Sequence, residues 1–186
     1  MTKTKADIRK QVLQFRNNIT SIKQQNAAQF ARNNFIQNIV LTGDEIIAAY
    51  MPINSELDCL PLVEKLQKLG HEICLPVVVE KNQAMVFRRW EQGGKLCKDA
   101  HNISTPNAKS KSMIPDIIIM PLVAFDKNGT RLGYGKGYYD RTIAKMEKKS
   151  LLVGYAFAGQ EVEYIEQEAH DVPLDYLVNE KEVRQF

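Results

Sequence analysis

The sequence predicts an α/β fold with three layers, in which a mostly parallel central sheet is flanked by helices. Apolar runs of strand length alternate along the chain with segments whose apolar residues recur at helical spacing. The most apolar run, residues 116–125, is rich in β-branched residues and does not alternate with polar ones, as in a strand buried on both faces. The 186 residues suffice for one sizeable core, so we expect a single domain over residues 1–186.

The first two helices are predicted from the spacing of their apolar residues. The first ends near Asn17 and Asn18, and its apolar residues are Ile8, Val12, Leu13 and Phe15. The second is expected to start at a capping box that Ser21 forms with Gln24 and to stop before Gly43. Its apolar residues are Phe30, Ile36, Ile39 and Val40.

A strand over residues 45–51 should follow, ended by Pro52. Ser55 is then expected to cap a third helix that stops at Gly70, a residue suited to a helix C-terminus. The apolar residues of this helix are Leu57, Leu60, Val63, Leu66 and Leu69.

The remaining two thirds of the chain predict the rest of the sheet. We expect further strands over residues 73–79, 84–90, 116–125, 151–157 and 176–178. Residues 91–113 are polar and rich in Gly, Asn, Ser and Lys, which predicts a loop, and residues 137–149 predict a helix. Strands that alternate with helices in this way are typical of a parallel sheet.

The amino-acid composition argues against two classes of binding partner, nucleic acids and membranes. The 25 Lys+Arg and 22 Asp+Glu residues leave a net charge of only +3, so we expect no nucleic-acid partner. The lysines within residues 95–111 would be the candidate RNA-binding segment, but interleaved aromatic residues are missing there. No apolar run approaches the roughly 18 residues that cross a bilayer, so we expect no membrane partner. The three cysteines lack paired spacing, which predicts free thiols, and with no secretory signal we expect a cytoplasmic protein. We also expect the protein to be a monomer.

The glycine-rich run from Arg131 to Arg141, Arg-Leu-Gly-Tyr-Gly-Lys-Gly-Tyr-Tyr-Asp-Arg, carries the strongest chemical signal. It joins a buried strand to a helix, where free backbone N–H groups point at an anion in α/β proteins. Its glycines let the backbone approach a ligand, and Arg131 and Lys136 add positive charge, which together predict a phosphate site. The spacing fits neither a Walker A loop nor Gly-x-Gly-x-x-Gly, so a metal accompanying the phosphates would need another oxygen ligand, and Asp140 is nearest. A tight connection without a ligand is the alternative.

Two other segments are candidates for the same site. Lys5 and Arg9 share a helix face and repel each other, and an anion held by both would relieve this, although a solvated charged face is the alternative. Met51 and Glu56 follow the first strand. We expect Glu56 at a helix N-terminus, either as capping support or facing a donor of a heterocycle on which Met51 packs.

The run from Arg131 to Arg141 resembles the signature of the 5-formyltetrahydrofolate cyclo-ligase family, also called methenyltetrahydrofolate synthetases. The resemblance covers nearly the whole chain, from Lys5-Ala-Asp-Ile-Arg9 to His170-Asp-Val-Pro-Leu-Asp175. It implies an enzyme that uses ATP and Mg²⁺ to convert 5-formyltetrahydrofolate to 5,10-methenyltetrahydrofolate, releasing ADP and phosphate.

The resemblance also implies ligand contacts. The nucleotide would contact Lys5, Arg9, Arg131, Leu132, Gly133, Tyr134, Gly135, Lys136, Gly137, Tyr138 and Tyr139. The folate would contact Met51, Glu56, Tyr134, Gly135, Lys136, Gly137 and Tyr138. The magnesium ligands would be Asp140 and Asp175.

The chemistry of such a reaction suits these residue types. Phosphoryl transfer to the formyl oxygen gives an imino-phosphate that can lose phosphate as the ring closes. Catalysis is then mostly positioning and charge stabilisation, which we assign to Lys136 and Arg131. Tyr138 and Tyr139 would orient phosphate or folate, although a tyrosine that faces the core is the alternative for one of them. The alternative is a regulator that binds folate or nucleotide without catalysis.

Overall fold

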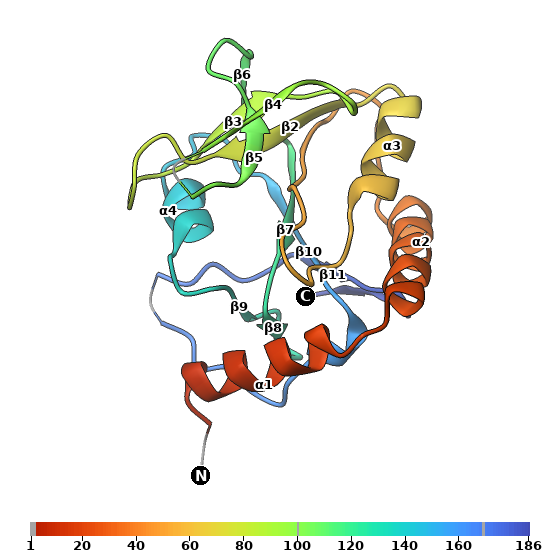
Figure 1. The fold of residues 1–186 in the computed structure, drawn as a ribbon, viewed down its shortest axis with the longest axis vertical. Helices are drawn as coiled ribbons and strands as arrows, with labels where there is room; N and C mark the ends of the chain where they lie inside the picture. Colours follow the sequence, from red (N-terminus) through yellow and green to blue (C-terminus); the bar gives the residue numbers. More distant parts are fainter. Residues whose placement is uncertain (1–2, 100, 169) are drawn as a thin grey trace.

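The computed structural model describes residues 3–99, 101–168 and 170–186, which form an α/β fold around one large sheet (Figure 1). Its eight strands lie in the order β12 (Val183–Gln185), β11 (Tyr176–Val178), β10 (Leu151–Tyr155), β7 (Ile117–Pro121), β1 (Ile46–Ala48), β2 (Glu72–Val77), β3 (Val86–Arg89) and β6 (Ser112–Met113). The strands from β11 to β2 are parallel to one another, whereas β12, β3 and β6 are antiparallel to their neighbours. The mostly parallel sheet is therefore confirmed.

Helices cover both faces of this sheet. In Figure 1, α2 (Ser21–Asn38) and α3 (Leu60–Lys68) lie on one side and α4 (Tyr138–Ala144) lies on the other. Side chains of β7 contribute to the hydrophobic cores on both faces of the sheet. Ile117 and Ile119 pack toward α2 and α3, while Ile118 and Met120 pack on the α4 side. This confirms the prediction of a sheet between two helical layers. It also explains why apolar and polar residues do not alternate within residues 116–125.

A smaller unit lies beyond the carboxyl end of β7. Strands β8 (Ala124–Phe125) and β9 (Arg131–Leu132) form an antiparallel pair, against which α1 (Lys5–Asn17) packs through Ile8 and Val12. The segment between β9 and α4 is the glycine-rich run. The position of α1 therefore brings the amino-terminal residues close to that run.

Three helix details differ from the sequence predictions. In α1 the buried positions continue from Ile8 and Val12 to Arg16, while Phe15 is exposed. In α2 the N-cap is Thr20 without a side-chain bond, so the capping box at Ser21 is wrong. The buried face of α2 also differs, since Phe30 and Val40 are exposed and the buried residues are Ala27, Ala28, Ala31 and Phe35. Small alanines let the helix pack closely, which a search for large apolar residues misses.

The third helix begins later than predicted. It starts at Leu60 after Cys59, with proline in the first turn, a position where the missing N–H costs nothing. Ser55 is therefore not a helix cap, and its hydroxyl donates instead to Asn17 Oδ1 at 2.7 Å. Gly70 does end the helix, with φ +98°.

The predicted loop over residues 91–113 contains three short strands. Strands β4 (Leu96–Lys98) and β5 (Ser104–Pro106) form a hairpin, and β6 joins the edge of the large sheet. Helix α4 ends at Ala144 rather than at residue 149, and β12 had no predicted counterpart. No described helix is long and apolar enough to span a bilayer. All three cysteines are free thiols.

Candidate active site

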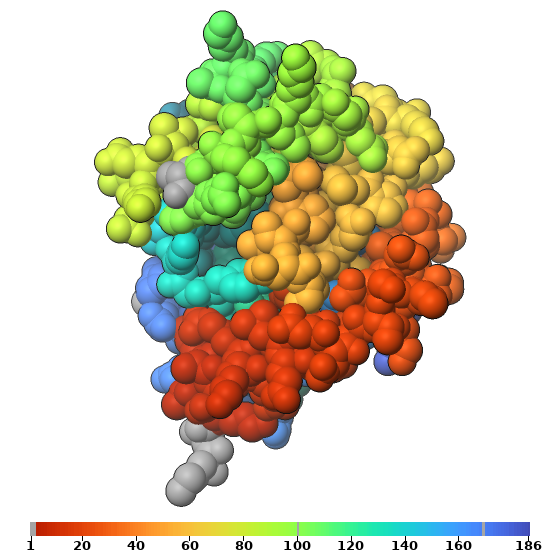
Figure 2. Space-filling model, in the orientation of Figure 1, coloured from red at the N-terminus to blue at the C-terminus, as the bar shows by residue number. Residues whose placement is uncertain are grey.

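A pocket of about 490 Å³ opens where the carboxyl ends of β1, β2 and β7 meet. Its walls come from the start of α1, from residues 50–56, from the β4–β5 hairpin and from the glycine-rich run, and Glu168, His170 and Asp171 complete them. Figure 2 shows the surface hollowed where the orange, green and cyan segments meet above α1. Ligands of parallel α/β sheets bind at this end of the strands.

The glycine-rich run adopts a backbone that favours glycine at two places. Gly135 has φ +89° and Gly137 has φ +61°. A Cβ on Gly135 would also lie 3.4 Å from Arg9 Nη2, so this glycine lets the Arg9 guanidinium pack against the backbone. A Cβ on Gly133 would meet open space. The need for glycine is therefore conformational at Gly135 and Gly137.

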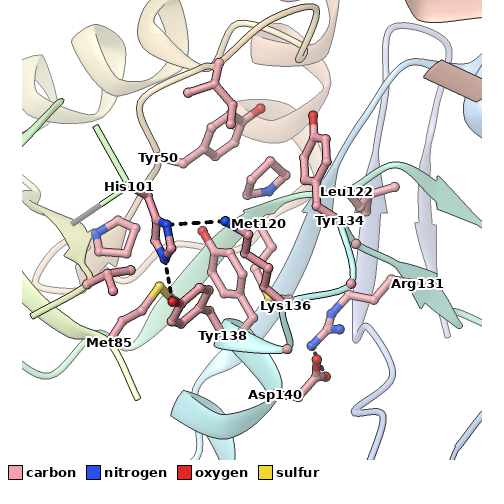
Figure 3. Close-up of a pocket in the computed structure, with 18 of the residues that line it drawn as sticks. Tyr50, Met85, His101, Met120, Leu122, Arg131, Tyr134, Lys136, Tyr138 and Asp140 are labelled. Carbon is pink, nitrogen blue, oxygen red and sulfur yellow. Dashed lines mark hydrogen bonds and ion pairs between the residues drawn. The ribbon is translucent and has the colours of Figure 1, made fainter. Parts of the chain in front are cut away.

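Lys136 and Tyr138 of this run extend toward the hairpin. Lys136 is exposed, and its Nζ lies 3.3 Å from Nδ1 of His101 (Figure 3). The Tyr138 hydroxyl lies 2.5 Å from His101 Nε2, and the Arg141 guanidinium lies 5.0 Å from the Tyr138 ring centroid. His101 had no predicted role, because nothing in its local sequence sets it apart from the surrounding polar residues.

Arg131 and Asp140, predicted in separate roles, form an ion pair with each other. Arg131 Nη2 lies 2.7 Å from Asp140 Oδ1, and only 7% and 15% of the two side chains are exposed. Burial leaves Arg131 Nε without a hydrogen-bond partner among the described residues. Tyr139 also lines the pocket but packs into the α4-side core, where burial raises the pKa of its hydroxyl. This hydroxyl therefore stays protonated and can donate.

Lys5 and Arg9 both line the pocket, at the end where the glycine-rich run begins. Arg9 Nε donates to the Gly133 carbonyl oxygen at 2.9 Å. Lys5 Nζ lies 2.7 Å from Glu168 Oε1 and 3.1 Å from Asp171 Oδ2. These two carboxylates already balance the charge of Lys5, so relief of the repulsion between the two basic residues does not require a ligand.

Glu56 and Met51 line the other end of the pocket. Glu56 does not stand at a helix N-terminus as predicted, because α3 begins four residues later; its Oε2 instead accepts a hydrogen bond from the Ile53 amide at 3.0 Å. Burial raises the pKa of the Glu56 carboxyl, although the Ile53 amide, Arg16 and Tyr134 act to lower it. Glu56 is thus a buried carboxyl group at the pocket wall, with one oxygen bound to the Ile53 amide.

Arg16 is fully buried behind this end of the pocket and was not predicted as a site residue. Its guanidinium donates to the carbonyl oxygens of Ser55 at 3.1 Å and Leu122 at 3.2 Å, and to the Tyr134 hydroxyl at 3.0 Å. It therefore joins the segment of Glu56 to the glycine-rich run. The sequence did contain a signal for the burial of Arg16, because residues 8, 12 and 16 lie on one face of α1 and the first two are apolar.

The two predicted magnesium ligands do not come together. Asp175 Oδ2 accepts a hydrogen bond from the Leu152 amide at 2.8 Å, at the amino end of β10, and Asp175 does not line the pocket. Asp171, four residues earlier, lines it together with Asp140. No group of three His, Cys, Asp or Glu side chains within residues 3–99, 101–168 and 170–186 is arranged for a metal. Two carboxylates that line one pocket are nevertheless of the type that Mg²⁺ takes, since it binds through one or two carboxylates plus phosphate oxygens.

Comparison with known proteins agrees with the resemblance seen in the sequence. The model of the 5-formyltetrahydrofolate cyclo-ligase family matches residues 1–180. The chain is 32% identical over 184 residues to the 5-formyltetrahydrofolate cyclo-ligase of Haemophilus influenzae, covering 95% of this chain and 98% of that protein. It is 32% identical over 178 residues to the enzyme of the same name from Escherichia coli, covering 92% and 98%. The NMR structure of Aquifex aeolicus 5,10-methenyltetrahydrofolate synthetase matches with a TM-score of 0.83 and 34% identity over 97% of this chain and 92% of that one. The chain therefore belongs to the 5-formyltetrahydrofolate cyclo-ligase family.

Proposed function

We propose that this chain uses ATP and Mg²⁺ to close 5-formyltetrahydrofolate into 5,10-methenyltetrahydrofolate, with release of ADP and phosphate. One observation carries the assignment to this pocket: Lys5 and Arg9, Met51 and Glu56, and the glycine-rich run come from three distant parts of the chain and line one cavity. Nucleotide and folate bound there would meet at residues 134–138. The cyclo-ligase activity itself is inferred from the membership of the chain in this family.

The chain's residues can supply what the reaction needs. The γ-phosphoryl group passes to the formyl oxygen, the neighbouring anilino nitrogen attacks the formyl carbon, and phosphate leaves with that oxygen. Lys136, Arg9 and the backbone N–H groups of residues 133–137 would hold the triphosphate and the charge that develops on it. Arg131 would act from its ion pair with Asp140, and Tyr139 would donate from the pocket floor. Glu56 would accept a hydrogen bond from the folate.

The metal would be held by Asp140 and Asp171 in place of the predicted pair with Asp175. Mg²⁺ supplies charge neutralisation on the phosphates when it is bound. We also propose a single domain, because the described helices and strands are arranged around one large sheet, and we propose that it works as a monomer. Free thiols support a reducing compartment such as the cytoplasm.

A direct assay tests the function. Purified protein with ATP, Mg²⁺ and 5-formyltetrahydrofolate should produce the absorbance of the methenyl product, with one phosphate released per product. Binding of folate and ATP without phosphate release would instead support the non-catalytic regulator.

The backbone of Gly135 yields a further prediction. Alanine at φ +89° costs about 1–2 kcal/mol, so Gly135→Ala should raise the KM for ATP roughly 5- to 30-fold. Gly43→Ala is the matched control: Gly43 has φ +110°, and a Cβ on it meets open space in a turn outside the pocket. The control should lose stability without changing the KM. A wild-type KM in Gly135→Ala contradicts the prediction.

The buried Glu56 predicts a pH dependence of stability. Its folded-state pKa lies above the unfolded value of about 4.3, so its stabilising contribution is complete below that pH and is lost as pH rises through the folded pKa. Urea denaturation from about pH 4 to 8 should therefore show wild type losing stability relative to Glu56→Gln as the pH rises.

Glu64 provides a control of opposite sign for this experiment. A hydrogen bond from Lys68 lowers the pKa of Glu64, so its contribution is lost as the pH falls. The free energy of unfolding of wild type relative to Glu64→Gln should accordingly fall at acid pH. If the difference between wild type and Glu56→Gln does not change with pH, the prediction for Glu56 is wrong.

A further inference from the structure

His101 projects into the pocket from the β4–β5 hairpin, facing the glycine-rich run (Figure 3). The turn that carries it is fixed by Asp99, whose Oδ1 accepts hydrogen bonds from the amides of His101 at 2.8 Å and Ile103 at 3.0 Å. The imidazole ring meets the Tyr138 ring edge-on, with 5.2 Å between the ring centroids. The ring is thus held from two sides, by its own turn and by Tyr138.

The contact with Lys136 determines which nitrogen carries the proton. An ammonium group only donates hydrogen bonds, so Nδ1, 3.3 Å from Lys136 Nζ, must accept. The imidazole is then neutral with its proton on Nε2, which donates to the Tyr138 hydroxyl oxygen. The Asn82 amide donates to the same oxygen at 3.3 Å. Because this oxygen already accepts two hydrogen bonds, the Tyr138 O–H is left to donate into the pocket.

Lys136 has little else to orient it. Among the residues that the structure describes, no carboxylate lies within ion-pair distance of its Nζ, and His101 is its side-chain partner. A lysine has a flexible four-carbon stem, and an unrestrained ammonium would have to be ordered anew in each catalytic cycle. His101 therefore limits where this charge lies.

We propose that His101 is a positioning residue: as a neutral acceptor it aims the Lys136 ammonium at the phosphoryl group being transferred. This role rests on the proposed function of the pocket and adds to it a residue that acts through Lys136. It also explains how the hairpin takes part in the site, since His101 lies 35 positions before Lys136 in the sequence.

A set of variants at position 101 tests this role. His101→Ala should lower kcat roughly 10-fold or more, with a smaller change in the KM for ATP, because a misplaced charge loses transition-state stabilisation. His101→Asn places an amide oxygen where Nδ1 lies and should retain most of kcat. His101→Gln places its amide near the position of Nε2 and keeps the Tyr138 contact. Its kcat should be as low as that of His101→Ala.

The decisive measurement is the double variant. If His101 acts through Lys136, then His101→Ala with Lys136→Ala should be no slower than Lys136→Ala alone. Additive losses in the double variant, or equal losses in the Asn, Gln and Ala variants, overturn the proposal. Lys109→Ala, an exposed position in the same polar segment and outside the pocket, should keep wild-type kcat. If wild type makes no product, it is the proposed function that fails; if wild type is active and this pattern is missing, only the role of His101 fails.

Discussion

Lys136→Ala is expected to lower kcat by at least about 100-fold, a loss on the order of 3 kcal/mol of transition-state stabilisation. Lys136 lines the pocket on the run that would hold the triphosphate, and its ammonium is not committed to an ion pair within the described residues. The side chain is exposed, so its removal should leave the fold intact. Steady-state rates of methenyl product formation, with circular dichroism to verify folding, measure the effect.

A matched lysine separates this effect from a general loss of positive charge. Lys127 is exposed in the turn between β8 and β9 and does not line the pocket, so Lys127→Ala should keep wild-type kcat. Lys136→Arg keeps the charge but not the shape of the ammonium, and should recover part of the rate. Full activity in Lys136→Ala would remove this residue from the mechanism.

The largest loss of stability is expected from Arg16→Ala, at about 3–5 kcal/mol. The substitution removes three hydrogen bonds at once, leaves the buried Ser55 carbonyl without its donor, and takes a positive charge from the neighbourhood of buried Glu56. Urea denaturation at neutral pH gives the free energy of unfolding. We expect Tyr134→Phe, which removes one of the three contacts, to cost about 1 kcal/mol.

A second position on the same helix serves as the control. Lys10 is exposed on α1, so Lys10→Ala should change the free energy of unfolding by no more than about 0.5 kcal/mol. A loss below about 1 kcal/mol in Arg16→Ala would show that its hydrogen bonds are replaced by water, and that Arg16 does not join the two segments of the pocket.

The features that could be predicted from sequence were those determined locally. Within the predicted strand over residues 116–125, β7 (Ile117–Pro121) is buried on both faces of the large sheet, as its composition predicts, whereas Ala124–Phe125 form β8 of a separate two-stranded sheet. The glycine-rich run follows a buried strand and leads into a helix, so its place at the carboxyl end of the sheet followed from the order of elements. The same order of elements put Met51 near it.

What could not be predicted depends on contacts between distant residues. Lys136 meets His101 across 35 positions, and Arg16 meets Tyr134 across 118. The position of Asp175 outside the pocket has a related reason: Asp171 and Asp175 lie in one short block, and only the packing of that block places the first in the pocket and the second at the amino end of β10. Ser55 and Glu56 lie before α3 rather than at its start, because Pro61 suits the first turn of a helix that begins at Leu60.

The internal ion pairs of the pocket have a consequence for selectivity among anions. Arg131 is neutralised by Asp140, and Lys5 by Glu168 and Asp171. A small dianion such as sulfate that bound through Arg131 or Lys5 would have to separate these partners and leave carboxylates without compensation. A polyphosphate that arrives with its own divalent cation brings a substitute partner for each displaced carboxylate. We therefore expect the acidic side chains to disfavour binding of small inorganic anions at Arg131 and Lys5.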